Sequence, residues 1–171
     1  EIDVEDVHNR RNNSYLEIGH KFKDDFLEAY EKLNTKKTFD LSPVSVAERS
    51  FKNICLVYLA RLGEFDIAYQ QFISADCMTD QYGAFQSLLN AENSHRDEVI
   101  ERFYHQHRSD VQVMDKWFSA QAISSLTSVR DIRNLMKHEL FNIKNPNRVR
   151  SVIGSFSQNY IQFHCQDGYE L

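Results

Sequence analysis

The stretch SVAERSFKNICLVYLARLG, residues 45–63, decides the fold class of this chain. Ser45 and Glu48, three residues apart, form a capping-box pattern, which predicts the start of a helix, and Gly63 predicts its end. Between them, apolar residues recur every three or four positions, as on one face of an α-helix. These residues are Phe51, Ile54, Cys55, Tyr58, Leu59 and Leu62.

The same spacing continues on both sides of this stretch. Upstream, it predicts one long helix carrying apolar residues from Tyr15 to Leu33, which NTKKTFDLSP (34–43) interrupts. Downstream, short helices are expected from Phe65 to Ala75, then after caps at Thr79, Ser94, Ser128 and Asn145, with a further one around Val113 to Ile123. Glycine and proline are scarce (5 and 2), and no segment alternates with a period of two. The chain is therefore predicted to be all-α.

Many helices joined by short turns favour stacked antiparallel hairpins, as in an armadillo/HEAT-like superhelix. No exact internal repeat supports this assignment, so it depends on the element lengths alone. Residues 1–171 are expected to form a single helical domain, since this length suits one well-packed core. The ends of the chain suggest an incomplete piece of a longer helical domain.

Composition and charge exclude several classes of function. A net charge of −5 argues against broad nucleic-acid binding, which needs basic surface. No apolar run approaches the roughly 20 residues of a membrane span, and no signal-peptide pattern opens the chain. Cys55, Cys77 and Cys165 are odd in number and widely spaced, which indicates reduced thiols, and the first two are expected to be buried. A cytoplasmic protein is predicted.

Seven histidines offer no recognisable metal site. HELFN, beginning at His138, lacks the second histidine of H-E-x-x-H. His105 and His107 would point to different sides of a helix, so packing or solvent-facing roles are expected for them. No nucleophile elbow, P-loop or dinucleotide fingerprint is present. We therefore predict no catalytic residue and no metal ligand in this chain.

Two further motifs are expected to be structural. Trp117 in MDKWF is predicted to pack in the core, with Asp115 and Lys116 pairing to neighbours. Met78–Asp80 is predicted to form a turn and a helix cap.

NPNRVR, residues 145–150, places positive charge at the start of a helix that Asn145 caps and Pro146 opens. A helix start is itself positive, so Arg148 and Arg150 there are unfavourable unless an anion completes the arrangement. Helix amides and guanidinium groups together could bind a carboxylate or a phosphate. The alternative is an arginine that bridges to an acid on a neighbouring helix.

Four stretches, SADCMTDQYGAFQSLL (74–89), VQVMDKWFSAQA (111–122), KNPNRVRSVIGSF (144–156) and FHCQDGY (163–169), carry a family resemblance. From about residue 20 to its end, the chain resembles the C-terminal helical domain of bacterial aminopeptidase N, a zinc-dependent alanyl aminopeptidase of the gluzincin class. The family usually reads Asp-Gly-Ser-Gly-Tyr where this chain has Asp167-Gly168-Tyr169, so either the loop is shorter here or residues of the loop are missing from this sequence.

The resemblance implies that this chain is the N-terminal portion of that superhelical domain, and that it is non-catalytic. The zinc, its ligands and the catalytic glutamate would lie upstream in the catalytic domain of the same parent chain. This piece would cap the active-site chamber, with Arg150, and as a second candidate Arg148, binding the carboxylate of a peptide substrate. The rival interpretation is a free-standing helical-repeat scaffold that binds a partner protein. Exposed apolar surface would favour a piece of a larger enzyme.

Overall fold

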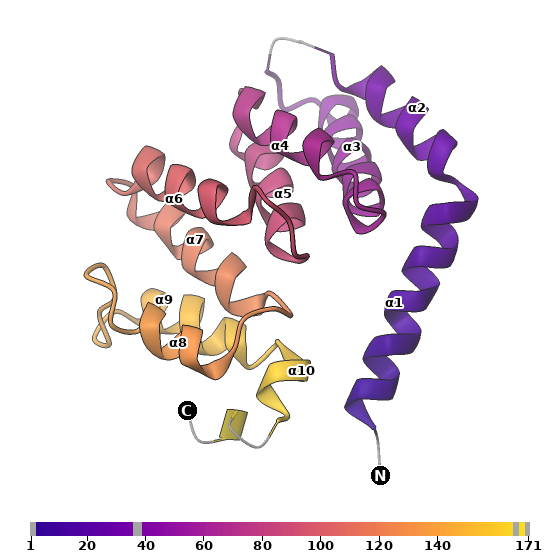
Figure 1. The fold of residues 1–171 in the computed structure, drawn as a ribbon. Coiled ribbons are helices and arrows are strands. Elements are labelled where there is room, and N and C mark those ends of the chain that lie inside the picture. The colour runs from indigo at the N-terminus through magenta and orange to yellow at the C-terminus, as the bar shows by residue number, and fades with distance from the viewer. Residues whose placement is uncertain (1–2, 36–38, 166–167, 170–171) are drawn as a thin grey trace. The chain divides into compact units, whose positions relative to one another are not determined.

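The computed structural model describes residues 3–35, 39–165 and 168–169, and the regular secondary structure of these residues is entirely helical, with no strand among them. The all-α prediction is confirmed. Figure 1 shows the helices in chain order. They are α1 (Val4–Lys21), α2 (Lys23–Leu33), α3 (Pro43–Arg61), α4 (Phe65–Ser74), α5 (Met78–Leu89), α6 (Arg96–His107), α7 (Val111–Ile123), α8 (Val129–Leu135), α9 (Pro146–Val149), the π-helical turn η1 (Arg150–Gly154) and α10 (Tyr160–Phe163).

The chain divides into two compact units. One unit is residues 9–99, and the other combines residues 1–8 with residues 100–171. A single domain over residues 1–171 stays a prediction. The shortened loop at Asp167 lies partly outside the described residues, so its predicted departure from the family pattern also stays a prediction.

In the first unit, α3 packs against α2, α4 and α5. Of the apolar face predicted for α3, Cys55 and Leu59 are fully buried, but Phe51 and Ile54 are about half exposed, at 49% and 51%. The inward face is therefore rotated from the predicted one, because tertiary packing selects Lys52 and Leu56 as additional buried positions. Large side chains from the other helices complete the core, namely Phe72, Phe85, Leu88 and Leu89.

The boundaries of α3 follow local rules, with one correction. The helix begins at Pro43, and the Ser42 side chain caps it by accepting a hydrogen bond from the Ser45 N–H. The predicted capping box at Ser45 is wrong, because Ser42 followed by proline is a stronger start and the Ser45 hydroxyl instead donates to Asp40. Gly63 ends the helix as predicted, with φ +93°. Its N–H and that of the next residue close a Schellman motif onto the last turn.

The long helix predicted to reach Leu33 is two helices. Phe22, with φ −117° and ψ 25°, separates α1 from α2. Neither glycine nor proline marks this break, so the sequence gives no local signal for it. The two helices still contact α3 through rings: Phe26 stacks on Tyr58 with centroids 4.4 Å apart, and Tyr15 lies 5.6 Å from the same ring.

Other helix starts show which capping signals are reliable. The box formed by Ser128 and Asp131 at α8 and the Asn145 cap at α9 are both confirmed. Thr79 is not a cap, because α5 already begins at Met78, and α6 begins two residues after the predicted cap at Ser94. Met78–Asp80 therefore forms the first turn of α5 and not a preceding turn.

In the second unit, α7 packs against η1 and α9. Trp117 is buried as predicted, and its indole N–H donates to the Ile100 carbonyl at 3.0 Å. The core around it is apolar and fully buried, with Phe103, Met114, Phe118, Ile132, Val152 and Phe156.

Candidate functional site

Residues within the segment 145–150 themselves stabilise the start of this helix. The Asn145 side chain accepts hydrogen bonds from the N–H groups of Asn147 (3.0 Å) and Arg148 (3.4 Å). Pro146 occupies the first helical position, where its missing N–H costs nothing. A side chain thus already satisfies two of the free amides at this helix start, and the two arginines follow directly.

The helix then widens into the π-helical turn η1, which the sequence did not predict. Single π turns within α-helices occur frequently at functional sites. The turn is held on α7 by a short hydrogen bond between the hydroxyls of Ser119 and Ser155, and the N–H of Ser155 donates to the Arg150 carbonyl. Arg150 is therefore the first residue of a turn whose backbone is fixed against a neighbouring helix.

Arg148 points inward and is 4% exposed. Its Nε lies 3.3 Å from Asp115 Oδ1, and its guanidinium carbon lies 4.7 Å from the centroid of the Phe118 ring. Burial lowers the pKa of Arg148, while the Asp115 carboxylate raises it. Arg148 thus makes the bridge to an acid on a neighbouring helix that the sequence left open as an alternative, and the predicted pairing of Asp115 is confirmed.

Arg150 is exposed. Within the part of the chain that the structure describes, its guanidinium has no ion-pair or hydrogen-bond partner. The structure therefore separates the two arginines of the motif, with Arg148 used inside the fold and Arg150 available at its surface.

His138 lies beside this motif in an aromatic cluster. Its ring centroid is 5.2 to 5.4 Å from those of Tyr104, Trp117 and Phe118. Its Nδ1 accepts a hydrogen bond from the Leu140 N–H at 3.1 Å, so the neutral ring carries its proton on Nε2. Burial lowers the pKa of His138. The packing role expected for the histidines fits His138, and it fits His107, which lies 4.8 Å from Phe103.

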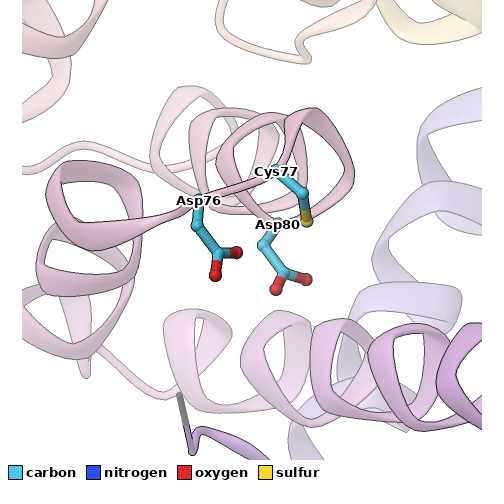
Figure 2. Close-up of side chains that lie close together, drawn as sticks. All are labelled: Asp76, Cys77 and Asp80. Carbon is cyan, nitrogen blue, oxygen red and sulfur yellow. The ribbon is translucent and has the colours of Figure 1, made fainter. Parts of the chain in front are cut away.

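The unit of residues 9–99 contains three potential metal ligands at the junction of α4 and α5, namely Asp76, Cys77 and Asp80 (Figure 2). Their ligand atoms all lie within 4.8 Å of one another. Cys77 is only half-buried, which corrects the prediction that it is buried like Cys55. The Lys52 ammonium already lies 2.6 Å from Asp80 Oδ2, so a cation at this cluster would compete with a lysine.

The sequence did not predict the polar network around that lysine. Asp80 also accepts a hydrogen bond from Asn53 at 2.9 Å, and the Gln71 amide donates to Asn53 and to the Asp80 carbonyl, each at 2.8 Å. The signal available in the sequence was the position of Lys52. It precedes Cys55, Leu56 and Leu59, which are buried, by three, four and seven residues, and this spacing places it on the same face of the helix. Lys52, Gln71 and Asp80 of this network also line a cavity of about 290 Å³ between α3 and the start of α5.

Comparison with known proteins identifies the family to which this fold belongs. The family described as a domain of unknown function with ARM repeats (DUF3458_C) matches residues 1–170, and the chain belongs to this family. The helical-repeat class predicted from element lengths is thereby confirmed.

The similar curated proteins are named aminopeptidase N. That of Haemophilus influenzae is 33% identical over 171 residues, which are 98% of this chain and 19% of that protein. That of Escherichia coli is 34% identical over 151 residues, covering 85% of this chain and 17% of that protein. The resemblance to aminopeptidase N given by the sequence motifs is confirmed. The chain spans about one fifth of the length of these relatives.

A solved structure has the same fold. It is Legionella pneumophila aminopeptidase A in complex with aspartic acid, with a TM-score of 0.87 and 24% sequence identity, matched over 99% of this chain and 22% of that one. Among the described residues, no helix has the length and apolar character needed to cross a membrane.

Proposed function

We propose that this chain is a non-catalytic helical part of a zinc metalloaminopeptidase that removes N-terminal residues from peptides. It would pack on the catalytic domain of the same parent chain in the cytoplasm, cap the active-site chamber and help to bind peptide substrate. The similarity to two proteins named aminopeptidase N, across nearly the whole of this chain, supports the proposal.

The residue that would contact substrate is Arg150, and the observation that carries this role is its separation from Arg148. Arg150 is exposed on the η1 turn, and no acid among the described residues pairs with it. An exposed guanidinium binds carboxylates well, because its planar N–H groups can donate two parallel hydrogen bonds to the two carboxylate oxygens. The anion that a peptide offers at the end distant from the reacting bond is its C-terminal carboxylate.

Arg148 remains the second candidate, but the geometry favours Arg150. A buried guanidinium already opposite Asp115 would have to leave that carboxylate to reach a substrate. Its role is better described as positioning, because it ties the start of α9 to α7.

The zinc would be bound by the catalytic domain of the parent, outside these residues. When bound, zinc supplies an activated water for attack on the peptide bond. The cluster of Asp76, Cys77 and Asp80 does not fit this role, because it offers no histidine and Lys52 is bonded to Asp80. We therefore expect the 171-residue chain alone to hold no stoichiometric zinc and to be inactive.

The test uses the parent enzyme with Arg150→Ala. We expect kcat/KM for peptides with a free carboxylate to fall about ten- to a hundredfold, the range of a charge-assisted hydrogen bond of about 1.5 to 3 kcal/mol. Aminoacyl anilides, which lack the carboxylate, should be hardly affected. Arg130→Ala, which removes an exposed arginine of α8, is the matched control. Equal losses on both kinds of substrate would contradict the role of Arg150.

Measurements on the chain itself test the non-catalytic assignment, and the upstream coding sequence separates the enzyme from the free-standing scaffold. Zinc content and anilide hydrolysis of the purified 171 residues should both be at background. Turnover with stoichiometric zinc would overturn the non-catalytic assignment. An upstream H-E-x-x-H in the same coding sequence would decide for the enzyme over the scaffold.

A further inference from the structure

Helix α3 exposes an apolar stripe, formed by Val44, Ala47, Phe51 and Ile54. The spacing of three, four and three residues places these side chains along one line of the helix. Val44, Phe51 and Ile54 are 68%, 49% and 51% exposed, and Ala47 is also exposed. Phe51 and Ile54 belong to the predicted apolar face of this helix, and the described residues leave about half of each side chain exposed.

The stripe continues into an interface that is already formed. The next residue in the series is Tyr58, four positions after Ile54, and it is covered by Phe26 of α2 and Tyr15 of α1. One line of α3 therefore packs against helices at its C-terminal end and is bare over its first three turns. A 3-4-3-4 spacing is the pattern by which one helix packs along another.

An end position in a helical-repeat array does not explain this surface. Terminal repeats carry a polar outer face, because no neighbour covers them, whereas internal repeats bury apolar faces against the next repeat. The stripe is apolar, as at an internal position. Since the chain spans about one fifth of its relatives, those proteins have about four fifths of their length available to supply a neighbour.

We propose that the stripe of Val44, Ala47, Phe51 and Ile54 is the docking surface for an amphipathic helix from the part of the parent chain outside residues 1–171. The helix would lie along α3 and extend the cover that α1 and α2 give to Tyr58. This inference rests on the proposed function, which supplies the longer parent chain. It assigns one surface of this domain to an internal helix contact and not to substrate.

The test is site-specific maleimide labelling of Phe51→Cys, read by peptide mass spectrometry, in the parent and in the 171-residue chain. We expect labelling in the parent to be at least tenfold slower than in the shorter chain. Val46→Cys is the matched control, because Val46 is exposed on the same helix, about 140° around from Phe51 and outside the stripe. It should label at similar rates in both proteins.

Each other outcome contradicts the proposal in its own way. Equal rates for Phe51→Cys would show that the stripe is bare in the parent. Slow labelling in the 171-residue chain would show that its own residues cover the stripe or, if the rate depends on protein concentration, that a second copy does. Aminopeptidase activity of the same parent preparation tests the proposed function separately, because protection at position 51 does not depend on turnover.

Discussion

The buried ion pair between Lys52 and Asp80 predicts a large loss of stability when only one partner is changed. Their charged atoms are 2.6 Å apart, and both side chains are less than a tenth exposed. In Asp80→Asn the lysine loses its counterion and retains at most a neutral amide oxygen at position 80, while Asn34 Oδ1, at 3.5 Å, is too distant for a strong bond. The ammonium would then be buried without compensation.

The expected cost is about 3 to 5 kcal/mol, the range found when one partner of a buried pair is removed. That is a large fraction of the roughly 5 to 15 kcal/mol by which domains are stable. The double variant Lys52→Met with Asp80→Leu removes both charges and should be less destabilised than Asp80→Asn, because no uncompensated charge remains. The single substitution is thus predicted to be worse than the double one.

Urea unfolding of the 171-residue chain, followed by circular dichroism, measures these free energies. Asp66→Asn is the control, since the Asp66 side chain is 94% exposed although it pairs with His95 at 2.8 Å, and it should cost less than about 1 kcal/mol. The reasoning is refuted if Asp80→Asn stays within about 1 kcal/mol of the unmodified chain. It is equally refuted if the double variant is the less stable of the two.

Tyr30 reports on the same pair independently. Burial, and then the Asp80 charge, raise the pKa of Tyr30 to about 12. In Asp80→Asn the second cause disappears while the burial remains, so the pKa of Tyr30 should fall but stay above the ordinary value of about 10. Ultraviolet titration of the phenol, compared with a Tyr30→Phe variant, measures this value.

Two further predictions concern stability. Because the pKa of His138 is lowered by folding, the unfolded chain binds the extra proton first, so stability should fall as the pH drops below about 6.5. Thermal unfolding at pH 7 and pH 5 should show a smaller fall for His138→Gln, and an equal fall would contradict this cause. In Gly83→Ala the added Cβ would lie 2.5 Å from Asn53 Oδ1, which should cost about 1 to 3 kcal/mol in urea unfolding. In Gly154→Ala the added Cβ would lie 3.7 Å from its nearest neighbour, so stability should instead rise by up to about 1 kcal/mol from helix propensity. A loss of stability in both variants would show that the backbone at these positions requires glycine.

The sequence predicted what neighbouring residues determine. The caps at Ser128 and Asn145 and the helix end at Gly63 form within a few residues, so their patterns could be recognised directly. The break at Phe22 and the rotation of α3 that buries Lys52 follow from packing between helices, which no local pattern encodes.

The candidate site divides in the same way. The positive charge at this helix start was predictable from the sequence. Which arginine remains available was not predictable, because Asp115, the partner of Arg148, lies 33 residues earlier and on another helix. The π-helical turn was also beyond prediction, because its residues read as an ordinary helix.

The two arginines of the motif constrain one another. Residues two positions apart in a helix point about 200° away from each other, so an inward Arg148 directs Arg150 outward. The contact of Arg148 with Asp115 and Phe118 therefore helps to set the direction of Arg150 without touching any substrate. On this reasoning Arg148→Met, which keeps much of the side-chain volume, should lower kcat/KM for peptides in the parent through Arg150. The loss should largely disappear when Arg150 is already alanine, whereas an independent contact of Arg148 with substrate would make the two losses additive.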